Sequence, residues 1–219
     1  MKVERIGTGV RGLDSKIGGG FEAGSITLLE GGPGSGKTLF GLQFAYEGAT
    51  SGENVLFISF DESPKDLISD MKAIGLNPDK YVDSGSLTFQ FFSPPEFLQK
   101  SIDARVAKYN ITRLVMDSVS SLLLYFKDEF TFRRFILDLI EKMKSFGVTT
   151  LITSGQDERT PDSLRMYSGE FLADTLINMM HDSSKGEYDR SMHIIKMRRT
   201  NHMRKLLPMK IDSKGLSIK

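Results

Sequence analysis

The chain has 219 residues, enough for one α/β domain with a substantial buried core, and no linker divides it. Basic and acidic residues nearly balance, 29 against 28, so the overall charge does not indicate a nucleic-acid or membrane surface. The absence of cysteine excludes disulfides and thiolate chemistry, which favours magnesium over zinc as a metal. No apolar run is long enough to span a membrane, and Lys2, Glu4 and Arg5 stand where a signal peptide would be apolar, so a cytoplasmic location is expected.

Strands and helices are predicted to alternate along the first half of the chain. Apolar runs bounded by turn residues predict strands, and longer periodic stretches predict helices. Ser63 and Pro64 mark one helix start, because serine caps a helix and proline fits its first position. In chain order we expect strand 26–30, helix 37–49, strand 55–60, helix 64–74, strand 87–92 and helix 94–109.

The second half of the chain continues this alternation and then changes. We expect strand 114–116, helix 129–146 and strand 148–153, followed after Gly169 by strands 175–180, 192–197 and 206–211. The polar stretch 183–189 is typical of a hairpin loop. The prediction is therefore an α/β fold with a mostly parallel central sheet, helices on both faces and a C-terminal antiparallel hairpin.

Residues 31–38 read GGPGSGKT, the pattern of a phosphate-binding P-loop (Walker A), between a predicted strand and a predicted helix. Glycines let the backbone fold so that successive N–H groups point at a triphosphate, and the next helix presents its positive N-terminus to the same anion. Lys37 is expected to bind the β- and γ-phosphates, and Thr38 the Mg²⁺ that bridges them. The sequence therefore predicts ATP and Mg²⁺ as ligands.

Acidic residues follow two other predicted strands. Asp117 ends strand 114–116, where ligands of open α/β sheets gather, and is expected to act as a Walker B acid that orients the magnesium. Asp61 and Glu62 follow strand 55–60, and one of them is expected to polarise the attacking water. In the alternative interpretation, Asp117 only caps a turn, and the other two acids only stabilise the next helix through its dipole.

Lys196 and Arg198 lie two residues apart on a predicted strand, so they share one face while Met197 points the other way. Such a cation pair suits phosphate, and in P-loop enzymes it stabilises transition-state charge, often from a neighbouring subunit. Two alternatives stay open: a solvated strand edge, or a nucleic-acid patch within a wider basic set. That wider set adds Arg199, Arg204 and Lys205.

Several segments together resemble the KaiC-like branch of the RecA superfamily. The most specific are TGVRGLD at 8–14, the P-loop, and KMRRTNH at 196–202. Weaker matches are GGG at 18–20, QF at 43–44, FDESP at 60–64 and EFLAD at 170–174. The resemblance covers almost the whole chain, is weak between residues 77 and 113, and implies a single KaiC-like RecA-type ATPase domain over residues 1–219.

The resemblance also implies a ring, usually a hexamer, with ATP held between subunits. It gives the phosphate-binding positions within one subunit to Gly34, Ser35, Gly36, Lys37, Thr38 and Leu39, and Gly32 and Pro33 of the P-loop are also expected to contact ATP. It gives the contacts to ATP across the interface to a second set, Lys196, Met197, Arg198, Thr200 and His202.

This sequence departs from the family pattern at several positions. Asp61 stands where the family has the first of two glutamates, and its side chain is one methylene shorter, so slow hydrolysis is expected. Arg199 replaces a glycine, and the family's acid near the chain end is shifted to Asp212. Because the cyanobacterial clock protein has two such domains and this chain has one, autophosphorylation and clock function are not carried over.

The sequence thus predicts a Mg-dependent ATP-binding protein and slow ATPase that couples nucleotide state to assembly or to an unidentified protein partner. One alternative is a nucleotide-gated scaffold with little hydrolysis. Another is a recombinase-like ATPase that binds single-stranded DNA, which the fold permits but the near-neutral charge does not favour. No membrane partner is expected.

Overall fold

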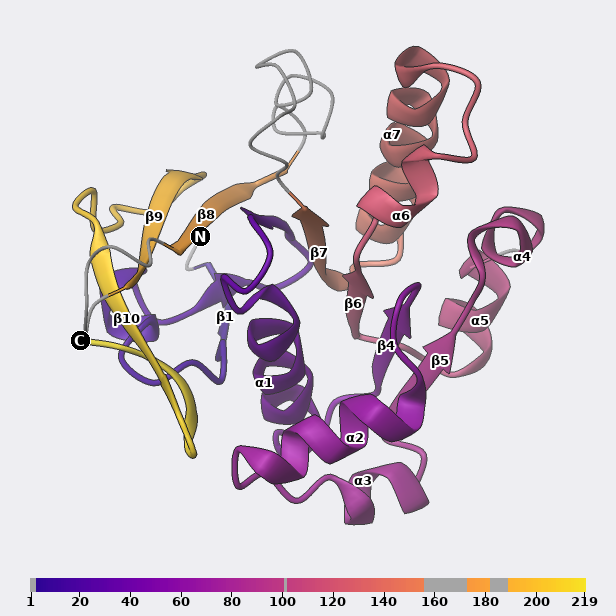
Figure 1. The fold of residues 1–219 in the computed structure, drawn as a ribbon. Coiled ribbons are helices and arrows are strands. Elements are labelled where there is room, and N and C mark those ends of the chain that lie inside the picture. The colour runs from indigo at the N-terminus through magenta and orange to yellow at the C-terminus, as the bar shows by residue number, and fades with distance from the viewer. Residues whose placement is uncertain (1–2, 101, 156–172, 182–188) are drawn as a thin grey trace.

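A nine-stranded sheet forms the centre of the computed structural model, which describes residues 3–100, 102–155, 173–181 and 189–219 (Figure 1). The strand order is β11-β10-β9-β8-β3-β7-β6-β4-β5. The strand bounds are β3 Ile26–Gly31, β4 Val55–Ser59, β5 Leu87–Phe91, β6 Arg113–Asp117, β7 Thr149–Gly155, β8 Thr175–His181, β9 Arg190–Met197, β10 Leu207–Asp212 and β11 Gly215–Ile218.

The six strands from β3 to β8 are all parallel to one another. Strands β9, β10 and β11 then add to β8 by antiparallel pairing, one after another. The predicted α/β class with a mostly parallel sheet is therefore confirmed. The antiparallel part is larger than the predicted hairpin, because β11 adds a further strand after a turn at residues 213–214. The predicted loop at 183–189 lies almost wholly outside the described residues.

Helices cover both faces of the sheet, as their buried residues show. Their bounds are α1 Lys37–Thr50, α2 Pro64–Ala73, α3 Asp79–Asp83, α4 Pro94–Gln99, α5 Ile102–Lys108, α6 Ser120–Leu123 and α7 Glu129–Ser145, with a 3-10 helix at Asp14–Lys16. Helices α1 and α2 pack in one hydrophobic cluster, and α4 to α7 pack in a second cluster across the sheet. Of the described helices, none is long and apolar enough to cross a membrane.

The helix expected over 94–109 is instead two helices, because Lys100 has extended backbone angles that end α4. In a continuous helix, Phe97 and Ile102 would point about 140° apart, since each residue turns the chain by about 100°. The break lets both side chains enter the same hydrophobic cluster. Burial of apolar side chains therefore outweighs the continuation of backbone hydrogen bonds at this point.

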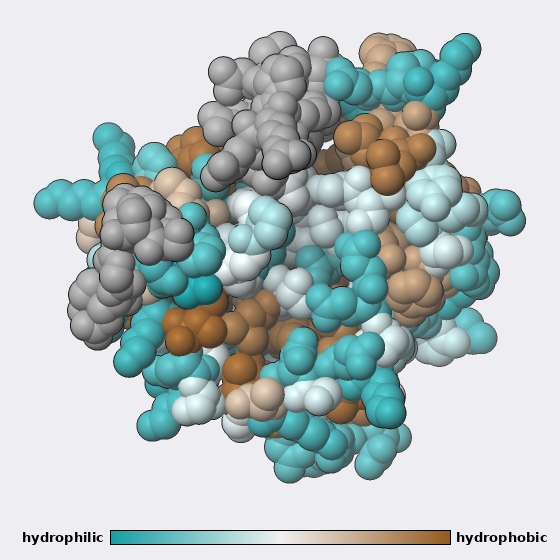
Figure 2. All heavy atoms as spheres, viewed as in Figure 1, coloured by the Kyte–Doolittle hydropathy of each residue, from teal (hydrophilic) through white to brown (hydrophobic). Residues whose placement is uncertain are grey.

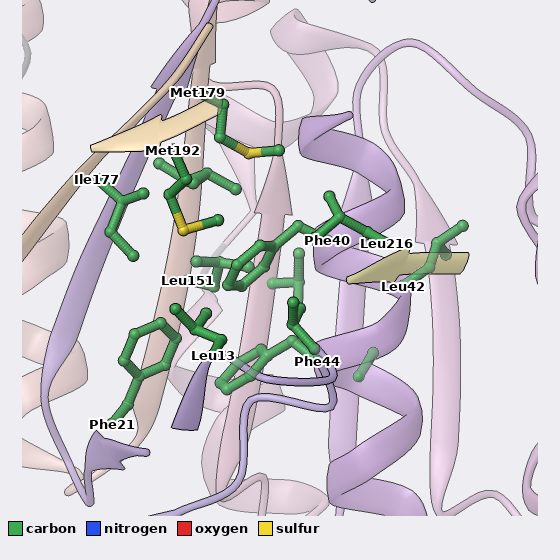
Figure 3. Packing of buried hydrophobic residues seen from close by; sticks show 14 of the residues in the cluster. Leu13, Phe21, Phe40, Leu42, Phe44, Leu151, Ile177, Met179, Met192 and Leu216 are labelled. Carbon is green, nitrogen blue, oxygen red and sulfur yellow. The ribbon is translucent and has the colours of Figure 1, made fainter. Parts of the chain in front are cut away.

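The N-terminal segment closes the core over α1. Strand β1 (Arg5–Ile6) pairs with β2 (Phe21–Glu22), and the Phe21 ring lies 6.2 Å from that of Phe40 and 5.7 Å from that of Phe44 (Figure 3). The α1 helix thereby joins the chain start to the sheet, and its first two residues are the last two of the P-loop.

Candidate nucleotide-binding site

The P-loop runs from the end of β3 to the start of α1, as its sequence requires. Gly34 and Gly36 have φ angles of 73° and 98°, in the left-handed region that favours glycine. A Cβ atom on Gly31 would lie 2.4 Å from the Met179 carbonyl oxygen, so this position also excludes a side chain. The loop therefore keeps the tight backbone path that brings N–H groups toward an anion.

Lys37 and Ser35 have polar atoms that fit a phosphate. The Lys37 Nζ donates to the carbonyl oxygens of Gly31 at 2.8 Å and Gly32 at 3.0 Å, so the side chain folds over the loop. Burial lowers the pKa of Lys37, and the charge of Asp117 opposes that shift. The Ser35 hydroxyl is buried without a hydrogen-bond partner among the described residues. An anion in the loop would give the Ser35 hydroxyl a partner and the Lys37 ammonium an opposite charge, so the residues fit a bound phosphate.

Asp117 ends β6 beside the P-loop, and its carboxylate accepts hydrogen bonds from the hydroxyls of Thr153 and Thr38. Burial raises the pKa of Asp117, while these two hydrogen bonds and the charge of Lys37 oppose the rise. A carboxylate and a hydroxyl next to a triphosphate site are oxygen donors of the kind that Mg²⁺ prefers. Thr38 and Asp117 therefore fit the metal predicted for them.

Asp61 and Glu62 lie in the turn after β4, which the Ser59 hydroxyl holds by accepting their backbone N–H groups at 3.3 and 2.9 Å. The Asp61 carboxylate accepts a hydrogen bond from the Ser121 hydroxyl of α6, at 2.8 and 2.9 Å to its two oxygens. Glu62 points elsewhere and lines a cleft together with Lys37. The two acids therefore have different surroundings despite their adjacency.

The cleft lies between the P-loop with α1 on one side and α2 on the other, and has a volume of about 350 Å³. Its lining consists of Gly34, Gly36, Lys37, Thr38, Leu39, Leu42, Glu62, Asp70, Ala73 and Ile74. Burial raises the pKa of Glu62, and the negative charges of Asp117, Asp70, Asp61 and Asp66 raise it further. A carboxylate with a raised pKa beside a phosphate loop is suited to accept a proton.

Lys196, in β9, and Arg198, just after it, lie at the opposite end of the strands from the P-loop. Arg198 donates its backbone N–H to Asp174, whose own N–H donates to Ile26 at the start of β3, while the P-loop follows the end of that strand. Five residues of strand span about 16 Å, well beyond the reach of an arginine side chain. These cations therefore cannot reach a nucleotide in the P-loop of their own chain.

The remaining residues predicted to contact ATP across an interface lie in or just after β9, near the same end of the strands. Met197 is buried in the hydrophobic cluster around α1, on the side of β9 away from its two cationic neighbours. The Thr200 hydroxyl accepts from Arg5 at 2.5 Å and lies 3.1 Å from the Arg198 carbonyl oxygen. His202 Nδ1 lies 3.1 Å from the Met203 carbonyl oxygen.

Arg190 is a site residue that sequence reasoning missed. Its Nε donates to the Gly34 carbonyl oxygen of the P-loop at 3.1 Å, and its guanidinium also pairs with Asp189, which contacts His181. Only the strand order indicates this contact. Because β9 runs antiparallel to β8, and β8 lies beside β3, β9 starts at the end of the sheet where the P-loop follows β3. No local sequence pattern carries that information.

Comparison with known proteins agrees with this geometry. A family model described as the KaiC ATPase matches residues 6–219. The chain belongs to the KaiC ATPase family. The predicted resemblance to KaiC-like proteins is thereby confirmed, and membership of this family supports ATP binding by the P-loop.

Individual relatives match the whole chain. It is 29% identical over its full length to the circadian clock oscillator protein KaiC of Parasynechococcus marenigrum (strain WH8102), and 31% identical over 99% of its length to KaiC of Thermostichus vulcanus. These matches cover 45% and 44% of the two relatives, so the chain spans less than half of their length.

A solved structure is also similar over its full length. The crystal structure of a KaiC-like protein from the hyperthermophilic archaeon Pyrococcus horikoshii OT3 has a TM-score of 0.88, with 34% identity and complete coverage of both chains. The RecA-like arrangement of the sheet is therefore that of the KaiC family.

Proposed function

We propose that this chain binds Mg-ATP in its P-loop and hydrolyses it slowly at the interface between identical subunits of a ring. The observation that carries the proposal is the convergence of four side chains on one site. Lys37 and Thr38 begin α1, Glu62 lies across the cleft, and Asp117 accepts a hydrogen bond from Thr38. This set provides phosphate binding, metal binding and a proton acceptor.

The residues of the P-loop bind and orient the triphosphate. Lys37 exchanges its bonds to the Gly31 and Gly32 carbonyl oxygens for bonds to phosphate oxygens. Thr38 and Asp117 are the residues that would hold Mg²⁺, which when bound neutralises charge on the β- and γ-phosphates. Burial of Asp117 favours a cation beside it, because an unpaired buried carboxylate is costly.

Glu62 is the residue proposed to accept the proton of the attacking water. It lines the cleft with Lys37. Its pKa is raised toward neutral pH, which makes it a stronger base than an ordinary carboxylate. The Asp61 carboxylate already accepts the Ser121 hydroxyl, so Asp61 is proposed to hold the turn after β4 against α6. Acceptance of the proton by Glu62 gives hydroxide character to the water in line with the γ-phosphate.

Lys196 and Arg198 are proposed to complete the site from the neighbouring subunit. They lie at the opposite end of the strands from the P-loop, so they cannot contact the nucleotide of their own chain. A cation supplied across an interface stabilises charge on the γ-phosphate in the transition state. Assembly and hydrolysis are therefore coupled, and a closed ring, proposed to be a hexamer, fits this head-to-tail contact.

An apolar surface on α6 and α7 is proposed to take part in assembly or partner binding. Leu124 is 88% exposed and Phe130 is 74% exposed, and brown side chains gather over these helices at the upper right of Figure 2. Because α6 also holds Ser121, the partner of Asp61, a change at the nucleotide site has a short route to this surface. Nucleotide state and binding are thereby linked.

The direct test is ATP binding by a Lys37→Ala variant, measured by calorimetry, with phosphate release from the same sample. We expect binding to weaken at least tenfold, since a charge-assisted hydrogen bond to phosphate contributes about 1.5–3 kcal/mol. Lys108→Ala serves as the matched control, because Lys108 is exposed at the end of α5. Unchanged ATP affinity in Lys37→Ala would refute the site.

A nucleotide-gated scaffold with little hydrolysis is the second candidate, favoured by the hydrogen bond that engages Asp61. It predicts that any weak phosphate release survives both Asp61→Asn and Glu62→Gln. Loss of phosphate release in Glu62→Gln, with ATP binding retained, would support the ATPase instead.

A further inference from the structure

Several cations surround one buried carboxylate, Asp174, at the end of the strands opposite the P-loop. Its side chain is 7% exposed, and its oxygens lie 2.9 Å from Lys144 Nζ, 3.6 Å from Arg198 and 3.9 Å from Arg199. Lys196 belongs to the same cluster, because Asp174, Arg198 and Lys144 all act on its pKa. Burial lowers that pKa first, and the two neighbouring cations lower it further.

Asp174 also fastens this cluster to the strand that leads to the P-loop. Its carboxylate accepts the Ile26 N–H at 3.0 Å, its own N–H donates to the Ile26 carbonyl oxygen at 2.8 Å, and its carbonyl oxygen accepts the Arg198 N–H at 2.9 Å. Lys196 Nζ donates to the adjacent Ala173 carbonyl oxygen at 2.7 Å. The end of β9 is therefore fixed to the start of β3.

A second carboxylate, Glu22, also belongs to this cluster, because its oxygen lies 2.9 Å from Arg199 Nε. Arg199 also lies 3.9 Å from Asp174, so carboxylates from two parts of the chain contact the cations that follow β9. Ion pairs of this kind restrict where the charged ends of these side chains lie.

We propose that Asp174, together with Lys144, is a positioning residue that orients Lys196 and Arg198 toward the γ-phosphate of ATP bound by the neighbouring subunit. This inference rests on the proposed function, because it assumes that the two cations act across an interface. Lysine and arginine side chains are flexible, and a cation accelerates phosphoryl transfer only when it is held where charge develops. Asp174 supplies that constraint from within the fold.

An Asp174→Asn variant tests the proposal, because the amide oxygen still accepts the Ile26 N–H while the negative charge is lost. We expect kcat to fall about tenfold or more, with KM for ATP within about threefold of wild type, since transition-state contacts are lost and binding by the P-loop is kept. Lys144→Gln is expected to lower kcat in the same direction. Asp103→Asn removes a comparable ion pair to Lys142 on α7 and is the matched control, with kcat unchanged.

A subunit-mixing experiment separates positioning from a structural defect. Lys37→Ala subunits lack a working P-loop but keep the Asp174 cluster, and Asp174→Asn subunits keep a working P-loop. An equal mixture is expected to recover about a quarter of the wild-type rate, because one interface in four then joins an intact loop to an intact cluster. A defect confined to the P-loop of the Asp174→Asn chain would give no recovery, and would overturn the proposal.

The same mixing with Arg198→Ala distinguishes this inference from the function on which it rests. Recovery with Arg198→Ala but none with Asp174→Asn would leave the shared site standing and refute the positioning role. Failure of both mixtures would refute the shared site itself, and with it this inference. Recovery of both, with melting temperatures near that of wild type, supports the proposal.

Discussion

Two adjacent acids, Asp61 and Glu62, are expected to differ in importance because their side chains have different contacts. Glu62 lines the cleft beside Lys37, whereas Asp61 is hydrogen-bonded to Ser121. We expect Glu62→Gln to lower kcat by about 10²–10⁴-fold, the typical contribution of a general base, with ATP binding retained. Asp61→Asn should cost less than about tenfold, because an amide oxygen still accepts the Ser121 hydroxyl. Steady-state phosphate release checks both variants, and a larger loss for Asp61→Asn would reverse their roles.

The rate should also depend on pH through Glu62. Its pKa is raised, first by burial and then by Asp117 and other nearby acids, and a general base acts in its deprotonated form. The rate should therefore fall as pH falls through this raised pKa, at a higher pH than for an ordinary glutamate. Measuring kcat against pH tests this, and the residual rate of Glu62→Gln should no longer show this fall at low pH. The same fall in the variant would assign the titration to another group.

At the scale of elements, Gln43 ties α1 to both ends of the chain. Its buried side chain donates to the carbonyl oxygens of Gly9 and Leu216 at 3.0 and 3.2 Å, and accepts the Leu216 N–H at 2.6 Å. Gln43→Leu should lower the free energy of unfolding by about 2–4 kcal/mol, because three buried polar groups lose their partner. Each kcal/mol should lower the melting temperature by about 2–4 °C for a chain of this size.

Thermal unfolding followed by circular dichroism measures this effect. Gln99→Ala, an exposed change at the end of α4, is the control and should shift stability by less than about 0.5 kcal/mol. A melting temperature for Gln43→Leu that equals the control would show that these hydrogen bonds contribute little.

The elements that the sequence predicted well are those encoded by local pattern. Strand β3 is buried along its whole length, Gly34 and Gly36 of the P-loop have positive φ angles that glycine adopts readily, and Ser63 caps α2 by accepting the Asp66 N–H. Each of these features depends on residues within a few positions of one another, so a single sequence window contains the physical cause.

The features that were missed depend on contacts between distant residues. The break at Lys100 follows from the burial of Phe97 and Ile102 in a common core. Arg190 meets Gly34 only because β8 and β9 fold back beside β3, and Asp61 meets Ser121 only because β4 and β6 are neighbours. Such juxtapositions arise from sheet order, which periodicity does not specify.

At the scale of the whole molecule, ATP should promote assembly. The Lys196 and Arg198 cations cannot reach the P-loop of their own chain, so a bound triphosphate is expected to attract them from a second copy. Molar mass measured by light scattering should therefore rise when Mg-ATP is added, and Arg198→Ala should reduce the rise. Asp103→Asn is the control, because its ion pair to Lys142 lies between α5 and α7. A mass unaffected by nucleotide in the wild type would argue against ATP-dependent assembly.

The proposed site lies in the loop between β3 and α1, and a neighbouring subunit completes it. A structure determined with Mg²⁺ and a nonhydrolysable ATP analogue would locate the nucleotide. We expect the triphosphate within the backbone amides of the loop from Gly34 to Thr38, with Lys196 and Arg198 of the adjacent subunit beside the γ-phosphate. A triphosphate bound elsewhere, or a neighbouring subunit that presents a different surface to it, would refute the shared site.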